Sequence, residues 1–431
     1  MLNSFVNRLL GRTRNRNPSR NSRRCLRLEG LEHRWLLSTY TMTVLGPGIA
    51  YGINDAGLVV GGGGQAFTWD STNGWQPLQT FGENGLSDAY GVSPSGLIVG
   101  EAPSPIQGHP RHAVLYDQGT VTDLGTFGGP LSAARGVNDA GQVVGWAETD
   151  DPYEDEHAFL WDSQNGLQDL GTLGGLASTA WAINSSGLVV GHSFDGPRAF
   201  VWDSVSGMHD IGGGIRSGAY GVNDTGQVVG GQVVSSSNGD AFLYDGGTLT
   251  DLGNLGHGVA AALAINEAGV IVGGADARDS FSEHGFVYAD GAMTDLNDLV
   301  PPGSGLTIVA AEGINNAGQI VGYAQDRFSH NSAILLTPDD SGAARGVATG
   351  IVAVLVSIDE STGGVVPFAP PTNAPTERAA TTTAAPQPSE AWLRQATDAV
   401  FTRSHPPHAV GPGIEGETGG LTLDWSLPLQ K

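Results

Sequence analysis

One twelve-residue phrase returns along this chain, and it restricts the possible fold more than any other feature. It reads AYGINDAGLVVG from Ala50, and six further copies follow at intervals of 39, 45, 46, 39, 43 and 49 residues. These copies start at Ala89, Ala134, Ala180, Ala219, Ala262 and Ala311. A period of this length is typical of one four-stranded β-propeller blade. No long helical period interrupts the repeats, so we predict an all-β fold.

Each repeat contains the pattern expected of short antiparallel strands joined by tight turns. A short strand such as YGI leads into NDAG, where Asn or Asp accepts backbone hydrogen bonds and Gly adopts positive φ without steric cost. The strand VVG follows, and after a variable loop comes an apolar run such as AFLW at 158–161. A continuous apolar run suits a strand that is buried on both faces. Blades that stack face to face provide this burial.

The last repeat ends without a fourth strand, and the start of the chain supplies a replacement. SAILLTP at 332–338 is followed by no DLG segment, whereas TMTVLG at 41–46 aligns with TVTDLG at 120–125. We therefore predict a seven-bladed β-propeller of four-stranded blades over 40–338, in which the N-terminal strand completes the last blade and leaves no free edge. A decayed eighth repeat at 343–358 is the alternative, but that segment lacks the Asn-Asp turn.

Two sets of motifs resemble known families of exported bacterial proteins. HAFLWD at 157–162, DLGTLGG at 169–175 and AINSSGLVVG at 182–191 are similar to the HAF-repeat family of extracellular bacterial proteins. LEGLEHRWLLS at 28–38 resembles the LEPR-XLL motif of large surface proteins, with His33 where that motif has proline. The resemblance implies an extracellular or cell-surface location and no particular reaction.

The remaining segments are predicted from composition. Residues 1–39 form a basic head with the charged part of a signal peptide but no clear apolar core. Residues 339–388 are a linker rich in Pro, Thr and Ala, 389–403 can form a short helix, and 404–431 read as a disordered tail. The longest apolar run, at 346–358, is too short to span a bilayer.

Charge limits the partners of the repeat region. Between 40 and 338 there are 32 carboxylates against 6 arginines, a net charge of −26. Such a surface repels nucleic acid and anionic lipid, and we expect a monomer. The single cysteine, Cys25, cannot form an internal disulfide, so the repeats must be held by packing alone.

Residues that recur in every repeat are interpreted as architecture, because catalysis needs one asymmetric group of side chains. Two columns of aspartates should accept hydrogen bonds from the turns that follow them. They are Asp70, Asp117, Asp162, Asp203 and Asp245 after an aromatic residue, and Asp123, Asp169, Asp210, Asp251 and Asp295 before a leucine or isoleucine. A third column holds His112, His157 and His284, but Arg198 and Asp240 interrupt it, so a shared metal site is not expected.

The loop WAETDDPYEDE is the candidate for a specific contact, because it is strongly acidic and does not repeat. Six carboxylates crowd into nine residues: Glu148, Asp150, Asp151, Glu154, Asp155 and Glu156. A cation or a protein partner would relieve their repulsion, yet the loop is not a D-x-D-x-D-G calcium loop, and a solvated acidic loop is the alternative. No cofactor, metal or catalytic residue is predicted, with calcium kept as the only ligand this loop suggests.

These observations favour an exported, non-enzymatic binding or structural propeller whose partner is an extracellular protein or a glycan. The alternative is a hydrolase or lyase with its active site in the central funnel. An enzyme would need unrepeated carboxylates or histidines with shifted pKa values clustered at the funnel, whereas a binding module would present a broad loop surface.

Overall fold

The computed structural model describes residues 40–81, 86–106, 111–150, 155–194, 196–212, 216–235, 238–256, 258–277 and 282–339. Two short strands beyond them, β29 (Ser357–Ile358) and β30 (Val365–Val366), pair antiparallel. The predictions for the head, the linker, the short helix and the tail, and for most of the segment proposed as an eighth repeat, lie outside these residues.

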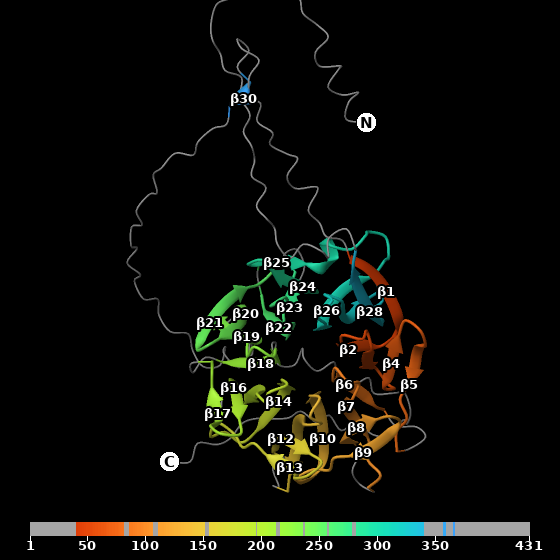
Figure 1. Ribbon diagram of the computed structural model, residues 1–431, viewed down its shortest axis with the longest axis vertical. Coiled ribbons are helices and arrows are strands. Elements are labelled where there is room, and N and C mark those ends of the chain that lie inside the picture. Colours follow the sequence, from red (N-terminus) through yellow and green to blue (C-terminus); the bar gives the residue numbers. More distant parts are fainter. Residues whose placement is uncertain are drawn as a thin grey trace, which may run out of the picture. The chain divides into compact units, whose positions relative to one another are not determined.

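Four-stranded antiparallel blades follow one another along the chain, as the repeat predicts (Figure 1). The first three are β2 (Ile49–Ile53), β3 (Val59–Gly62), β4 (Phe67–Asp70) and β5 (Gly74–Pro77); β6 (Asp88–Val92), β7 (Ile98–Pro103), β8 (Arg111–Asp117) and β9 (Thr120–Asp123); and β10 (Gly128–Val137), β11 (Val143–Thr149), β12 (Glu156–Asp162) and β13 (Gly166–Asp169). Single bridges, Gly62 to Asp88 and Leu131 to Arg111, connect these three blades into one sheet.

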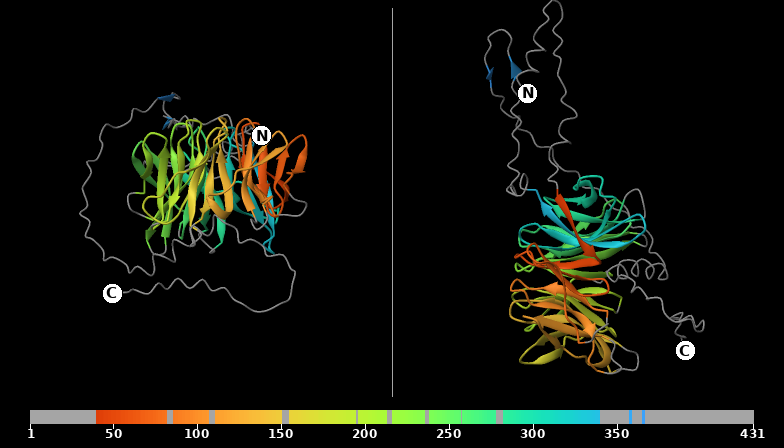
Figure 2. Two further views of the ribbon diagram at one scale, coloured as in Figure 1. Left: turned by 90° about the horizontal axis from the view of Figure 1, so that it is seen from below. Right: turned by 90° about the vertical axis from the view of Figure 1, so that its right-hand side faces the viewer.

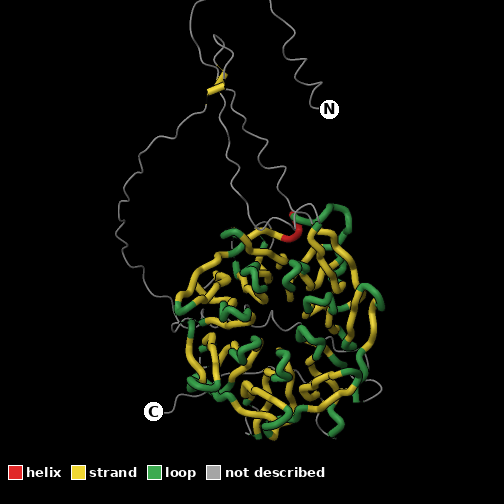
Figure 3. The backbone as a smooth tube through the Cα atoms, viewed as in Figure 1, coloured by secondary structure: helices red, strands yellow, loops and turns green. Residues whose placement is uncertain are grey.

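The later blades are separate sheets with the same strand order. They are β14 (Ser178–Ile183), β15 (Val189–Ser193), β16 (Arg198–Asp203) and β17 (Gly207–Asp210); β18 (Ser217–Val222), β19 (Val228–Ser235), β20 (Asn238–Asp245) and β21 (Thr248–Gly253); and β22 (Ala260–Ile265), β23 (Ile271–Asp276), β24 (Glu283–Ala289) and β25 (Ala292–Asp295). After β25 and the 3-10 helix η1 (Leu296–Asp298), the red segment of Figure 3, come β26 (Thr307–Ile314), β27 (Ile320–Gln325) and β28 (Asn331–Pro338).

The N-terminal strand completes the last of these blades, which confirms that prediction. β1 (Tyr40–Pro47) pairs antiparallel with β28, from Tyr40 opposite Pro338 to Pro47 opposite Ser332. Leu45 is buried in a cluster with Phe67, and Met42 packs against the core of the β26–β28 sheet. The first strand of each blade lies nearest the centre of the ring and the fourth lies outside (Figure 1), and Figure 2 shows the strands crossing the ring from face to face.

Phenylalanine and glycine on neighbouring strands explain the VVG and AF segments of the repeat. The third strand of several blades carries a fully buried phenylalanine, such as Phe159, Phe200 and Phe242. Its ring lies against the glycine of the second strand, since a Cβ at Gly191 would stand 2.7 Å from Cζ of Phe200. Each pair fills the space between sheets, and a larger residue at the glycine would displace the ring.

The asparagine of the first turn links each blade to the next as well as shaping its own turn. Asn184 Oδ1 accepts hydrogen bonds from the backbone N–H groups of Ser186 (3.1 Å) and Leu188 (2.9 Å), as the sequence predicts, and Gly187 has a φ of 83°. Its Nδ2 also donates to the carbonyl oxygen of Asn223 in the following blade, at 3.0 Å.

The same link recurs around the molecule and returns to its beginning. Asparagine Nδ2 donates to the carbonyl of the next turn in these pairs: Asn54 to Ser93, Asn138 to Asn184, Asn223 to Asn266, Asn266 to Asn315, and Asn315 to Asn54. The last pair joins residues 261 positions apart. The turns at one end of the first strands are thus connected across the point where the chain begins and ends its ring.

The aspartate columns behave as predicted in most repeats. Asp70, Asp162 and Asp203 each accept two backbone hydrogen bonds from the turn that follows. Asp123, Asp169, Asp210, Asp251 and Asp295 each accept one from the residue two positions on. Asp117 and Asp245 instead precede two-residue turns, at 118–119 and 246–247, in which both residues have positive φ.

Candidate functional site

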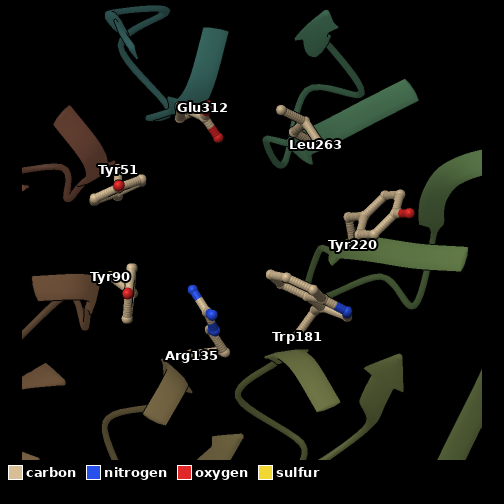
Figure 4. A pocket seen from close by; sticks show the side chains of 7 residues that line it. All are labelled: Tyr51, Tyr90, Arg135, Trp181, Tyr220, Leu263 and Glu312. Carbon is tan, nitrogen blue, oxygen red and sulfur yellow. The ribbon is translucent and has the colours of Figure 1, made fainter. Parts of the chain in front are cut away.

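The second position of the repeated phrase changes from blade to blade, and its side chains converge on one central cavity. The phrase is A-x-G or A-x-A at this point, and x comes from the first strand of each blade. The residues at x line a cavity of about 150 Å³ (Figure 4): Tyr51, Tyr90, Arg135, Trp181, Tyr220, Leu263 and Glu312. The backbone thus places the same position of every blade at this cavity, while the type of side chain there varies.

A local irregularity of the first strand aims these side chains at the cavity. In β14 the pairing with β15 shifts register between Ala180 and Ala182, so that Trp181 lies in a bulge. The corresponding shift occurs in the first strand of the other blades. A bulge re-aims a side chain and is frequent at functional sites. The small residue after x allows neighbouring first strands to approach, since a Cβ at Gly91 would lie 2.7 Å from the carbonyl oxygen of Arg135.

Aromatic rings form two walls of the cavity. Tyr51 and Tyr90 make an edge-to-face pair with ring centroids 5.1 Å apart, and Trp181 and Tyr220 make a second such pair at 5.6 Å. Figure 4 shows the first pair on one side of the cavity and the second pair on the opposite side. Edge-to-face pairs fix the rings that they contain, so the walls are preformed.

Arg135 extends into the cavity between these walls. Its guanidinium carbon lies 3.9 Å from the ring centroid of Tyr90 and 4.9 Å from that of Trp181. Both distances are within the range of cation–π attraction. The two rings thus hold a positive charge at the centre of a propeller whose surface is strongly acidic.

Glu312 enters the cavity from the side opposite Arg135 (Figure 4). Burial and, to a smaller extent, the nearby Glu283 raise the pKa of its carboxyl group, the positive charge of Arg135 partly offsets them, and the resulting pKa is about 7. The cavity therefore contains a fixed cation and a carboxyl group that titrates near neutral pH, on opposite walls.

The second strand supports several of the cavity side chains. Trp181 donates a hydrogen bond from Nε1 to His192 Nδ1 at 3.0 Å, and Tyr90 donates from its hydroxyl to Glu101 Oε1 at 3.1 Å. Arg111 forms an ion pair with Glu101. His192 and Glu101 occupy the same repeat position, eleven residues after the side chain that each one supports.

Tyr220 differs from these two because Gly231 occupies that supporting position. Its hydroxyl is buried and has no hydrogen-bond partner among the described residues. Burial raises the pKa of Tyr220 above its ordinary value, so the phenol is neutral at physiological pH.

The carboxylates of the predicted acidic loop lie in different environments, some buried and some exposed. Glu148 is buried and its Oε2 accepts a hydrogen bond from the backbone N–H of Leu131 at 2.9 Å. Glu156 accepts from the Thr179 hydroxyl at 3.0 Å, and burial raises its pKa. Asp150 is exposed and Asp155 is half-buried, while Asp151 and Glu154 lie outside the described residues. A binding role for this loop stays a prediction.

The histidine column pairs with the second aspartate column. Nδ1 of His112, His157 and His284 lies 2.6 to 2.8 Å from a carboxylate oxygen of Asp123, Asp169 and Asp295 respectively. His284 Nε2 also lies 3.5 Å from Ser282 Oγ, next to a second cavity of about 270 Å³ bordered by residues 300–307. The pairing recurs in separate blades, so it is a repeated feature of blade structure.

Two further observations bear on ligands and membranes. Within the parts of the chain that the structure describes, no group of three or more His, Cys, Asp or Glu residues could hold a metal ion. No helix in those same parts is long and apolar enough to cross a bilayer.

Sequence reasoning missed the cavity, although the signal was present. The sequence predicts the specific contact in a loop between strands, whereas the informative variation lies inside the most strongly repeated phrase. The first, third, fourth and fifth positions of the phrase change little, whereas the second runs Tyr, Tyr, Arg, Trp, Tyr, Leu, Glu around the blades. Because each blade of a propeller is arranged around a central channel, side chains at one position of the innermost strands can meet at the axis.

The chain matches no protein-family model and no curated protein sequence. Among solved structures it is similar to TolB from Acinetobacter baumannii, at 17% identity and a TM-score of 0.36, over 48% of this chain and 54% of that one. It thus spans about half the length of that protein.

Two structures named as propeller domains are covered almost completely. The β-propeller domain of the Trilobed protease from Pyrococcus furiosus matches at 8% identity and a TM-score of 0.43, over 69% of this chain and 95% of that one. The WD40 β-propeller domain of Doa1 matches at 13% identity and 0.42, over 70% and 98%. At these scores the fold assignment rests on the strand pairing described above.

Proposed function

We propose that this chain is a seven-bladed β-propeller of the HAF-repeat type that acts outside the cell as a binding module, with its ligand site in the central cavity. Seven copies of the phrase, each starting one four-strand unit, support the blade count. The resemblance of the HAFLWD, DLGTLGG and LEGLEHRWLLS segments to exported proteins supports the location.

The observation that carries the binding role is the variation at position x of the repeat. Asn54, Asn138 and most of their equivalents repeat because each joins one blade to the next. Position x has no such bond in common, yet the blades place five different residue types there, toward one cavity. An asymmetric site built on a symmetric ring is what recognition of a specific small ligand requires.

A screen with matched variants tests this function. The full-length chain would be screened against glycan and protein arrays, together with Trp181→Ala in the cavity and Val205→Ala on an outer turn, where Val205 is 93% exposed. We expect the ligand found with the wild-type chain to be lost with Trp181→Ala and kept with Val205→Ala. A ligand that binds all three proteins equally would place recognition elsewhere and contradict the proposal.

Glu312 favours one second candidate, a hydrolase or lyase at the same cavity. A carboxyl group with a pKa near neutrality can act as a general acid or base, and burial raises the pKa of Glu312 to about 7. The two functions separate when the ligand from the screen is incubated with the protein and followed by NMR. Product that forms with the wild-type chain and not with Glu312→Gln indicates an enzyme, and an unchanged ligand indicates a binding module.

A further inference from the structure

The walls of the central cavity select ligands with an apolar face. Trp181 is paired with Tyr220 on one side, and Tyr51 is paired with Tyr90 on the other. Rings in such pairs present flat apolar surfaces at a low cost in conformational entropy, because their orientations are already fixed. A ligand that fills this cavity must therefore offer at least one face of C–H groups.

The charges in the cavity disfavour an anionic ligand. Arg135 is its cation and lies near three carboxyl groups, those of Asp88, Glu156 and Glu312, whose pKa values burial raises and the charge of Arg135 partly lowers. A single guanidinium surrounded by several carboxylates does not give a positive potential, and the repeat region as a whole is strongly acidic. An anion would meet more repulsion than attraction on its way in.

A cationic ligand is disfavoured by Arg135 itself. The guanidinium already lies over Tyr90 and near Trp181, at 3.9 and 4.9 Å from their ring centroids. A second cation at these rings would stand next to a like charge. The aromatic walls are consequently not available as a cage for an ammonium group.

The polar side chains of the cavity suit a ligand that carries hydroxyl groups. Arg135 can only donate hydrogen bonds, whereas Glu312, on the opposite wall (Figure 4), accepts them when ionised and can also donate one when protonated. A hydroxyl group does both, so a ring with several hydroxyls can accept from Arg135 and donate to Glu312. A volume of about 150 Å³ is small for a binding pocket and suits one ring rather than a chain of rings.

We infer that the central cavity binds a neutral pyranose, the terminal sugar of a glycan, with its C–H face against Trp181 and its hydroxyls between Arg135 and Glu312. This inference rests on the proposed function and names its ligand class. The acidic exterior does not oppose such a ligand, because a neutral sugar carries no charge to repel.

Saturation-transfer NMR with methyl glycosides tests the ligand class. The full-length chain would be titrated with a panel of neutral methyl hexosides, the matching uronic acids and the matching amino sugars. We expect at least one neutral glycoside to bind, with at least a tenfold loss of affinity in both Trp181→Ala and Glu312→Gln. Trp181→Phe keeps an aromatic face and should lose less than Trp181→Ala.

Salt gives an independent readout. Affinity for a neutral ligand should change less than twofold between about 0.05 and 0.5 M NaCl, whereas a charged ligand would be screened. Binding restricted to uronic acids or amino sugars, or binding by none of the panel, overturns the inference. If the array ligand then still depends on Trp181, the proposed binding function survives; if no ligand depends on the cavity, both are overturned.

Discussion

Two positions only three residues apart in the repeated phrase have opposite patterns of variation. Asn184 directly follows the first strand of its blade, β14, and bonds to the next blade, and its equivalents are asparagine in every repeat except the second, which has Ser93. Trp181 lies in that strand and faces the central cavity, and its equivalents include aromatic, aliphatic, basic and acidic residues. One position of the phrase must therefore keep a bond between blades, whereas the other is free to change its chemistry.

The difference between the Asn184 and Trp181 positions indicates how a propeller built from similar repeats can contain one asymmetric site. The asparagine forms the same bond to an equivalent neighbour at each blade, so one side chain solves the problem everywhere. At the cavity the blades share one small volume, and seven identical side chains would give either crowding or uniform charge. Divergence at this one position supplies an asymmetric site while the ring remains unchanged.

Removing a complete repeated element should produce the largest effect. Deleting residues 40–47 removes β1, exposes the edge of β28, and takes away the buried Leu45 and the packing of Met42. Each such side chain contributes about 1.5–3 kcal/mol, and an open edge promotes association. We expect a loss of cooperative unfolding or a fall in Tm of more than about 10 °C, measured by calorimetry, with aggregates on size-exclusion chromatography.

Leu45→Ala is the milder partner of this deletion because it keeps the strand. It should lower the free energy of unfolding by about 2–4 kcal/mol and leave the protein monomeric. A deletion variant that melts within a degree or two of the wild type would show that the last blade is held closed by other contacts.

The second prediction compares the Asn184 and Trp181 positions by their effects on stability and on ligand binding. Asn184→Ala removes one bond to the Asn223 carbonyl and the acceptor for two turn N–H groups, at a residue that is 5% exposed. Unsatisfied buried groups cost about 1–3 kcal/mol, so unfolding measured in urea should shift by that amount while ligand binding stays within twofold. Trp181→Phe takes the Nε1 donor away from the buried His192 and so also costs stability, but unlike Asn184→Ala it should weaken ligand binding.

The chain contains its own control for the asparagine. Ser93 Oγ accepts a hydrogen bond from the Leu97 N–H, so serine can hold this turn. Asn184→Ser should therefore recover part of the stability lost in Asn184→Ala. The part recovered is the contribution of the hydrogen bonds within the turn. Equal losses in the two variants would assign the whole effect to the bond between blades.

The fold was predictable because its determinants are local and repeated. The period, the Asn-Gly turns and the missing last strand together predicted four-stranded blades and the pairing of β1 with β28. The central site was not predicted, because Tyr51 and Glu312 are 261 residues apart in the sequence and only ring closure brings them to one cavity. The bond from Asn315 to the Asn54 carbonyl was missed for the same reason.

A third, smaller effect concerns pH and the acidic member of the variable position. Burial raises the pKa of Glu312 to about 7, so the folded state holds this proton more tightly than the unfolded state, where glutamate titrates near 4.3. Stability from this group is therefore present below about pH 4 and is lost as the pH rises through about 7. Glu312→Gln cannot ionise and should gain a few degrees of Tm relative to the wild type between about pH 5 and pH 8.

The other carboxyl groups with raised pKa values, Asp88 and Glu156, follow the same direction and remain in both proteins. The difference between the two melting curves thus isolates Glu312. A constant difference in Tm across this pH range would mean that Glu312 ionises normally and that its burial costs nothing.

The smallest effect is expected at the acidic loop, which sharpens the comparison because it too varies between repeats but connects the second strand to the third. Glu148 accepts a hydrogen bond from a backbone N–H group and Glu156 from a threonine hydroxyl. Asp150 and Asp155 are the other members of the loop that the structure describes, and they are the ones to change. Calcium and sodium would be compared at equal ionic strength on the wild type and on the double variant Asp150→Asn, Asp155→Asn. A solvated loop predicts changes in Tm below about 1 °C that are the same for both ions and both proteins. A calcium increment of several degrees that the variant loses would instead establish a cation site there, and would show that variation in a loop, as well as at the axis, can mark function in this ring.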